Sequence, residues 1–151
     1  MKFLQKGHII FYTSQKYEEI YFRINKDLKY GYKEIFLLFA AIGAKNSRKS
    51  QLDKRGREFR ASFLNDEEAN MLYAILLNDP SIGKDVDVFN DPDKQTEMKK
   101  MLEQYAEGGA DILVEEVFKE KWNGYKLDEK YDTYSVDMLK YVIANINAVP
   151  F

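Results

Sequence analysis

The sequence predicts a mainly α-helical fold, a bundle of about five helices to which one short pair of β-strands is a candidate addition. Apolar residues recur at helical spacing in five separate segments of the chain. The 151 residues are enough to bury one core, and no shift in composition marks a second unit. Aromatic residues make up 15% of the chain, which favours a packed fold over disorder. Residues 1–151 are therefore interpreted as a single helical domain.

Two segments are candidate strands. His8 to Thr13 is rich in β-branched and aromatic residues. Glu58 to Leu64 alternates, with Phe59, Ala61 and Phe63 on one side. If both are strands, each is the natural partner of the other.

The first two helices follow the first candidate strand. Ser14 is the candidate N-cap of the first helix, whose apolar stripe reaches Leu28. The second helix, Tyr32 to Gly43, carries apolar residues on most of its faces, so we expect it to be buried. Gly43 is a candidate for its left-handed C-terminal cap.

The third helix begins at a strong start signal. Asn65 can accept from the first free amides, and Glu68 stands at the capping-box position. The helix is expected to end near Asn78, because Pro80 disfavours its continuation.

Asp91 and Pro92 start the fourth helix, as a cap followed by a proline at the first helical position. Its apolar stripe passes through Gly108 and Gly109 without losing its spacing. Because glycine inside a helix costs about 1 kcal/mol relative to alanine, the unbroken stripe favours close approach of a neighbouring helix at Gly109 over a break in the helix.

A fifth helix is predicted to start at Ser135. Its inward-facing residues are expected to be Leu139, Val142, Ile143 and Ile146.

Composition limits the compartment and the chemistry. The chain has no cysteine, which excludes disulfides and thiolate nucleophiles and fits a reducing cytosol. The N-terminus lacks the apolar core of a secretory signal. The longest apolar run, Ile35 to Ala44, is about half of the ~20 residues that cross a bilayer. We expect a soluble, cytoplasmic protein without membrane contact, and the sequence does not specify its oligomeric state.

Pro92, Asp93, Glu97 and Lys99 match the letters of a restriction-type nuclease site. That chemistry needs carboxylates and a lysine around one metal ion, normally from neighbouring strands. Here all four residues lie in the first two turns of one predicted helix, where Lys99 points away from the two acids. A solvated helix start is the better interpretation.

The other candidate sites are weak. The acidic connector that precedes this helix lacks the spacing, central glycine and closing glutamate of a calcium loop. His8 is the only histidine and has no nucleophile motif beside it. No phosphate-binding glycine motif is present. We therefore assign no catalytic residues, no metal site and no cofactor.

One charged feature stands out. The segment 45–60 has seven basic residues against two acids, a net charge of +5, whereas the remaining residues sum to −7. The basic residues are Lys45, Arg48, Lys49, Lys54, Arg55, Arg57 and Arg60. They could contact phosphates, contact a partner protein, or form an inert solvated surface. The net charge of −2 for the whole chain argues against general affinity for DNA.

Two blocks of sequence resemble the small Dnd system-associated proteins, which are encoded beside bacterial DNA phosphorothioation and restriction genes. They are YKEIF with FAAIG, within residues 32–43, and EQYAEGGADIL at residues 103–113. The resemblance covers residues 9–119 and leaves the tail from Lys121 unmatched. It implies an accessory protein of a bacterial DNA-modification or defence system, and it carries no catalytic residues over.

The sequence thus leads to one main functional hypothesis and two others. The main one is a non-enzymatic accessory or adaptor subunit of a bacterial DNA-modification or phage-defence system, which acts through contacts with protein subunits of that complex, with DNA contact as an additional route. The alternative is a DNA-binding regulator that uses the basic segment 45–60. The third is a small metal-dependent nuclease that uses the acidic connector.

Overall fold

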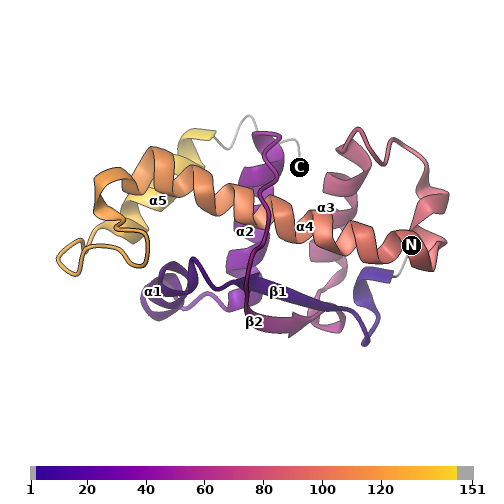
Figure 1. Ribbon diagram of the computed structural model, residues 1–151, viewed down its shortest axis with the longest axis horizontal. Coiled ribbons are helices and arrows are strands. Elements are labelled where there is room, and N and C mark those ends of the chain that lie inside the picture. Colours follow the sequence, from indigo (N-terminus) through magenta and orange to yellow (C-terminus); the bar gives the residue numbers. More distant parts are fainter. Residues whose placement is uncertain (1–2, 146–151) are drawn as a thin grey trace.

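The computed structural model describes residues 3–145, which form five α-helices and one two-stranded antiparallel sheet (Figure 1). The strands are β1 (Ile10–Ser14) and β2 (Arg55–Arg60). The helices are α1 (Glu18–Leu28), α2 (Tyr32–Lys45), α3 (Asp66–Asn78), α4 (Pro92–Leu113) and α5 (Tyr134–Asn145). Short 3₁₀ turns and one π-helical turn, Val114–Phe118, connect them. The predicted mainly helical fold class is confirmed.

The long helix α4 runs through the molecule and α2 crosses it (Figure 1). A Cβ on Gly109 would collide with the carbonyl oxygen of Phe39, and one on Gly43 would collide with that of Tyr105. The two helices therefore touch backbone to backbone, which only glycine allows. The close approach predicted at Gly109 is confirmed. The predicted C-cap at Gly43 is wrong, because α2 continues to Lys45 and Asn46 is its C-cap.

Aromatic packing joins the sheet to α2. The ring of Phe11 in β1 stacks on Phe59 in β2 at a centroid distance of 5.3 Å, and lies 5.4 Å from Phe36 in α2. All three rings are buried. The expectation that α2 is buried on most sides is confirmed, because seven of its residues are buried.

The predicted strand pair is confirmed, with a shift in its second member. Phe11 stands opposite Phe59 and Ile10 opposite Arg60. The prediction of a strand from Glu58 to Leu64 is wrong at both ends, because β2 spans Arg55–Arg60 and Ala61–Phe63 form a 3₁₀ turn. This turn buries Ala61 and Leu64 immediately before α3, which a continued strand could not do.

The helix starts follow the capping signals at two of three positions. Asn65 and Glu68 form a reciprocal capping box at the start of α3, and Asp91 caps α4 ahead of Pro92. The start predicted at Ser14 is displaced. Ser14 is the last residue of β1, and α1 begins at Glu18. The Ser14 hydroxyl still accepts from the amide of Tyr17, at 3.2 Å.

The helix α5 begins at Tyr134, next to its predicted start. The expectation that Ile143 faces inward is wrong, because its side chain is 67% exposed. Ile146, also expected to face inward, lies outside the described residues. Within residues 3–145, no helix combines the length and the apolar character that a bilayer crossing needs.

Candidate functional site

The basic segment 45–60 leaves the end of α2, crosses α4 and enters β2; Figure 1 shows it passing in front of α4. A Cβ on Gly108 would collide with the carbonyl oxygen of Arg48, so the segment lies directly on the helix backbone. Further along, the amide of Ser50 donates to the carbonyl of Gln104 at 3.0 Å. Gly108 therefore makes room for this segment, whereas Gly109 makes room for α2.

Arg48 is bound to α4 and to the turn that follows it. Its guanidinium donates two hydrogen bonds to Glu115, at 2.6 and 2.7 Å, and lies 3.6 Å from Asp111. This is the two-pronged geometry that suits a guanidinium and a carboxylate. The charge of Arg48 is thus neutralised within the chain.

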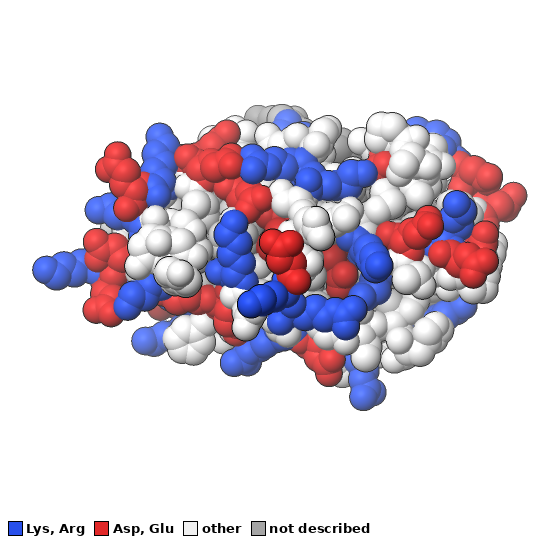
Figure 2. Space-filling view, in the orientation of Figure 1, with Lys and Arg blue, Asp and Glu red and all other residues white. Residues whose placement is uncertain are grey.

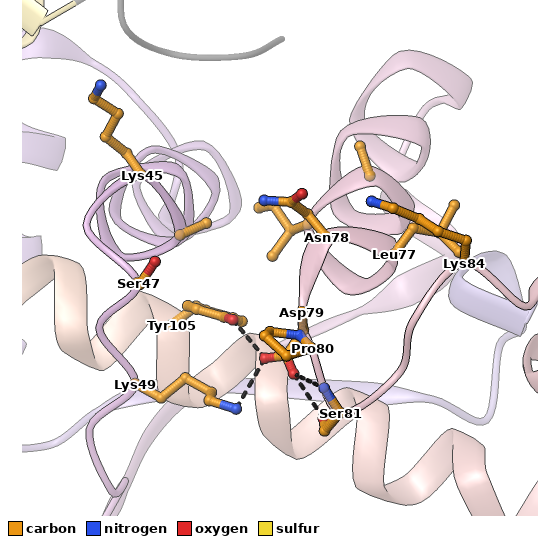
Figure 3. Close-up of a pocket in the computed structure, with 13 residues that line it drawn as sticks. Lys45, Ser47, Lys49, Leu77, Asn78, Asp79, Pro80, Ser81, Lys84 and Tyr105 are labelled. Carbon is orange, nitrogen blue, oxygen red and sulfur yellow. Dashed lines mark hydrogen bonds and ion pairs between the residues drawn. The ribbon is translucent and has the colours of Figure 1, made fainter.

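A cleft opens where α2, α3, α4 and the basic segment meet (Figure 3). Its volume is about 680 Å³, within the range of ligand-binding pockets. Small and apolar residues form much of its wall, and polar residues surround them. The cleft is lined by Ala44, Lys45, Ser47, Lys49, Ala74, Ile75, Leu77, Asn78, Asp79, Pro80, Ser81, Lys84 and Tyr105.

Asp79 is the polar centre of this cleft, with only 2% of its surface exposed. One carboxylate oxygen accepts from the Lys49 ammonium at 2.8 Å and from the Tyr105 hydroxyl at 2.5 Å. The other accepts from the amide and the hydroxyl of Ser81, at 2.8 and 2.6 Å. Figure 3 shows Lys49, Tyr105 and Ser81 converging on it from three different segments.

These bonds fix the protonation states of the cluster. Burial opposes ionisation of Asp79, but the bonds from Lys49, Ser81 and Tyr105 prevail and hold its pKa well below its usual range. Burial and the bond to Asp79 raise the pKa of the Tyr105 hydroxyl. At neutral pH the carboxyl is therefore charged and the phenol neutral. Because neither titrates near pH 7, the cluster is better suited to holding a shape than to transferring protons.

Two lysines stand at opposite sides of the cleft. Lys45 lies at the end of α2 and Lys84 follows α3, with its side chain running toward Asn78 (Figure 3). Lys84 is exposed and forms no ion pair within residues 3–145. The cleft thus combines an apolar wall with positive charge at its opening.

The later part of the basic segment faces outward. The Arg57 guanidinium lies 4.7 Å above the ring of Tyr32 and binds Glu18 at 3.2 Å, yet its side chain is 64% exposed. Arg55 lies 4.3 Å above the ring of Tyr12. In the described part of the chain, no ion pair involves Lys54, Arg55 or Arg60. Figure 2 shows Lys and Arg gathered across the front of the molecule, with acidic residues among them.

The seven basic residues predicted as a site therefore do not form one patch. Lys45 and Lys49 line the cleft, and Arg48 binds Glu115. The other four, Lys54, Arg55, Arg57 and Arg60, lie on or beside β2.

The cleft residues that sequence reasoning missed include Asp79, Ser81, Lys84 and Tyr105. Asp79 lies between Asn78 and Pro80, at the predicted end of the third helix. Nothing in its sequence neighbourhood pairs it with Lys49, thirty positions earlier. The one available signal was the turn-forming run from Asn78 to Ser81, directly after an apolar helix.

The residues that resemble a nuclease motif do not converge. Asp93 uses its amide in the cap formed by Asp91, and Glu97 lies 3.9 Å from Lys94. Lys99 instead binds Glu103 at 3.3 Å. Among the residues that the structure describes, no group of three or more histidine, aspartate or glutamate side chains is arranged to hold a metal ion.

A second buried carboxyl lies on the other side of α4. Glu107 is 5% exposed and accepts from the hydroxyl of Ser14 at 2.8 Å, while its Oε1 atom has no hydrogen-bond partner within residues 3–145. Burial raises its pKa to about 7. Asp111 and Asp53 contribute to this rise, the Ser14 bond and Lys16 oppose it, and about 7 is the net pKa.

Comparison with known proteins gives one match. The family model described as DNA sulphur modification system-associated protein 4 matches residues 24–127, which include α2, the basic segment, the cleft and α4. No curated protein and no solved structure matches the chain.

Proposed function

Because the chain belongs to the DNA sulphur modification system-associated protein 4 family, we propose that it is a non-enzymatic accessory or adaptor subunit that acts through contacts with other proteins of that system. Family membership associates the chain with a DNA sulphur modification system. The adaptor role is the step beyond it.

The cleft beside Asp79 is the observation that carries this proposal. Its apolar wall can take an apolar side chain, and Lys84 places positive charge beside that wall. We assign to it a partner segment in which an apolar residue is flanked by aspartate or glutamate. The charge of such a segment would complement Lys84, which forms no ion pair within residues 3–145.

The ion pairs of the basic segment also favour contact with a protein over contact with the phosphates of DNA. Arg48 and Lys49 already bind acids of the chain itself, and Arg57 binds Glu18. A cation that is neutralised internally has less to gain from a phosphate. The first role that we assign to the basic segment is therefore structural: it binds α4 and forms one wall of the cleft.

Co-purification from the native host tests the adaptor role. A tagged chain is expected to recover subunits of the modification system. The variant Ala74→Trp should lose them, because Ala74 is exposed and lines the cleft, so a large ring there occupies its volume. Asn70→Trp is the matched control, one turn earlier on the exposed side of α3 and outside the cleft. Failure of the wild-type chain to recover any subunit of the system would refute the proposal.

A DNA-binding regulator is the second candidate, favoured by Lys54, Arg55 and Arg60, which make no ion pairs within residues 3–145. It predicts binding to duplex DNA that weakens by about one unit of log-log salt slope per phosphate contact. Replacing Arg55, Arg57 and Arg60 with alanine should then abolish a gel shift. Unchanged binding by this triple variant would eliminate the regulator.

A further inference from the structure

The outer edge of β2 has no strand beside it in the described part of the chain. The sheet has two strands in the order β1-β2. On its other side β1 faces α4, where the amide of Tyr12 donates to Glu103 at 2.8 Å. Figure 1 shows β1 lying between β2 and α4. Within residues 3–145, only β2 therefore presents an open strand edge, and all of its residues except Phe59 and Gly56 are exposed.

The register tells which backbone groups lie on that edge. The amide of Ala61 donates to Ile9 at 2.9 Å, and the amide of Arg57 donates to the Thr13 hydroxyl at 3.0 Å. Phe59 stands between them, opposite Phe11. Because amides alternate in direction along an antiparallel strand, the N–H groups of Glu58 and Arg60 point away from β1. These two residues carry the donors and acceptors that another strand could use.

The side chains of this edge are predominantly positive. Three arginines and one glutamate leave β2 with a net charge of +2. Arg55 and Arg60 form no ion pair within residues 3–145. Phe63, at the end of the 3₁₀ turn that follows the strand, is 66% exposed and adds an apolar ring to the surface. The edge thus offers backbone hydrogen bonds, guanidinium groups and one aromatic ring.

We propose that β2 binds an extended acidic segment of a partner protein, which adds a third strand to the sheet through the backbone of Glu58 and Arg60 and pairs its carboxylates with Arg55 and Arg60. A second copy of this chain is a poorer occupant, because two β2 edges would bring arginine against arginine. The inference deepens the proposed function and rests on it, since the occupant is a protein of the same system.

Fluorescence anisotropy with a defined peptide tests the inference. The probe is a labelled peptide of about ten residues that alternates Glu with Val, an extended pattern with acid on one face. Arg60→Pro removes the outward N–H but no bond to β1, and the φ of −83° at Arg60 suits proline. Arg60→Ala is the matched control, because it removes the same charge and keeps the N–H. We expect Arg60→Pro to bind about tenfold more weakly than Arg60→Ala.

A chemical control on the peptide avoids any effect on folding. The same peptide with N-methyl groups on every residue keeps its charge but can donate no backbone hydrogen bond to β2, so it should bind the wild-type chain about tenfold more weakly. Equal binding of the two peptides would overturn the inference, as would equal binding by Arg60→Pro and Arg60→Ala. A surface that binds a short duplex DNA and not the peptide would also overturn it.

The outcomes separate this inference from the proposed function. If the wild-type chain does not bind the peptide but still recovers a subunit of the modification system, the strand edge fails alone. If the peptide binds and no subunit is recovered, the adaptor role fails instead.

Discussion

Asp79 and Glu107 are both carboxyl groups with 5% or less of their surface exposed, yet their pKa values move in opposite directions. Burial alone would raise both pKa values, because it disfavours the charged form. Asp79 has an ammonium, two hydroxyls and an amide as donors, and these reverse the effect of burial. Glu107 has one hydroxyl donor, and burial prevails. The difference shows that a buried acid stabilises the fold only when enough hydrogen-bond donors surround its carboxylate.

The two acids should give opposite slopes of stability against pH. The pKa of Asp79 lies below its unfolded value of 3.8, so its contribution is present above that pH and is lost as pH falls. The pKa of Glu107 lies above its unfolded value of 4.5, so its contribution is present below that pH and is lost as pH rises through about 7.

The variant Lys49→Met breaks the comparison most strongly, because it leaves Asp79 buried without its cation. We expect the free energy of unfolding at pH 7 to fall by about 3 to 4 kcal/mol, measured by urea denaturation. The double variant Lys49→Met, Asp79→Asn is the control. It should recover most of the lost free energy of unfolding, because asparagine leaves no unpaired charge buried in the cleft. A single variant as stable as the wild type would show that Asp79 does not depend on Lys49.

The variant Glu107→Gln removes the acid that lacks donors. Glutamine does not ionise, so its stability should not decline as pH rises from about 4.5 to 8. At pH 8 we expect the free energy of unfolding of the variant to exceed that of the wild type by about 3 kcal/mol, and at pH 4 the two should nearly coincide. Thermal melts across this range measure the gap, and a gap that stays constant with pH would contradict the assigned pKa.

The variant Arg48→Ala is expected to have the smallest effect on stability, and it tests whether an ion pair contributes less when its acid is exposed. Its partner Glu115 is exposed, with 54% of its side chain accessible. Exposed ion pairs contribute little, so we expect a loss below about 1 kcal/mol in the same urea experiment. A loss as large as that of Lys49→Met would mean that the contacts of Arg48 and Lys49 with the rest of the chain form and break together.

Local signals in the sequence predicted the parts of the fold that short-range physics controls. The capping box at Asn65 and the cap at Asp91 depend on residues within one turn, and both formed. The spacing of the stripe through Gly109 predicted close approach, because glycine in a helix needs a compensating contact. Ser14 failed as a helix cap because pairing with β2 kept it in the strand.

The candidate site was much less accessible to prediction. The basic segment was visible as a run of charge, but the run does not tell which cations find acids at distant positions. Lys49 meets Asp79 and Arg48 meets Glu115 only because the segment crosses α4 at Gly108. The cleft itself brings α2, α3, α4 and this segment together, and no single stretch of sequence contains it.

The sequence by itself determined a helical chain with one candidate strand pair, a glycine, Gly109, placed for close packing and a concentration of positive charge between α2 and β2. These features follow from periodicity, capping and composition, which act over a few residues. Only the tertiary structure decided that Arg48 and Lys49, early in this segment, form ion pairs with acids of the chain, while the later basic residues stay exposed along an open strand edge. The physical reason is that ion pairs and strand edges depend on which distant segments meet. The crossing of α2 and α4 determines which segments those are.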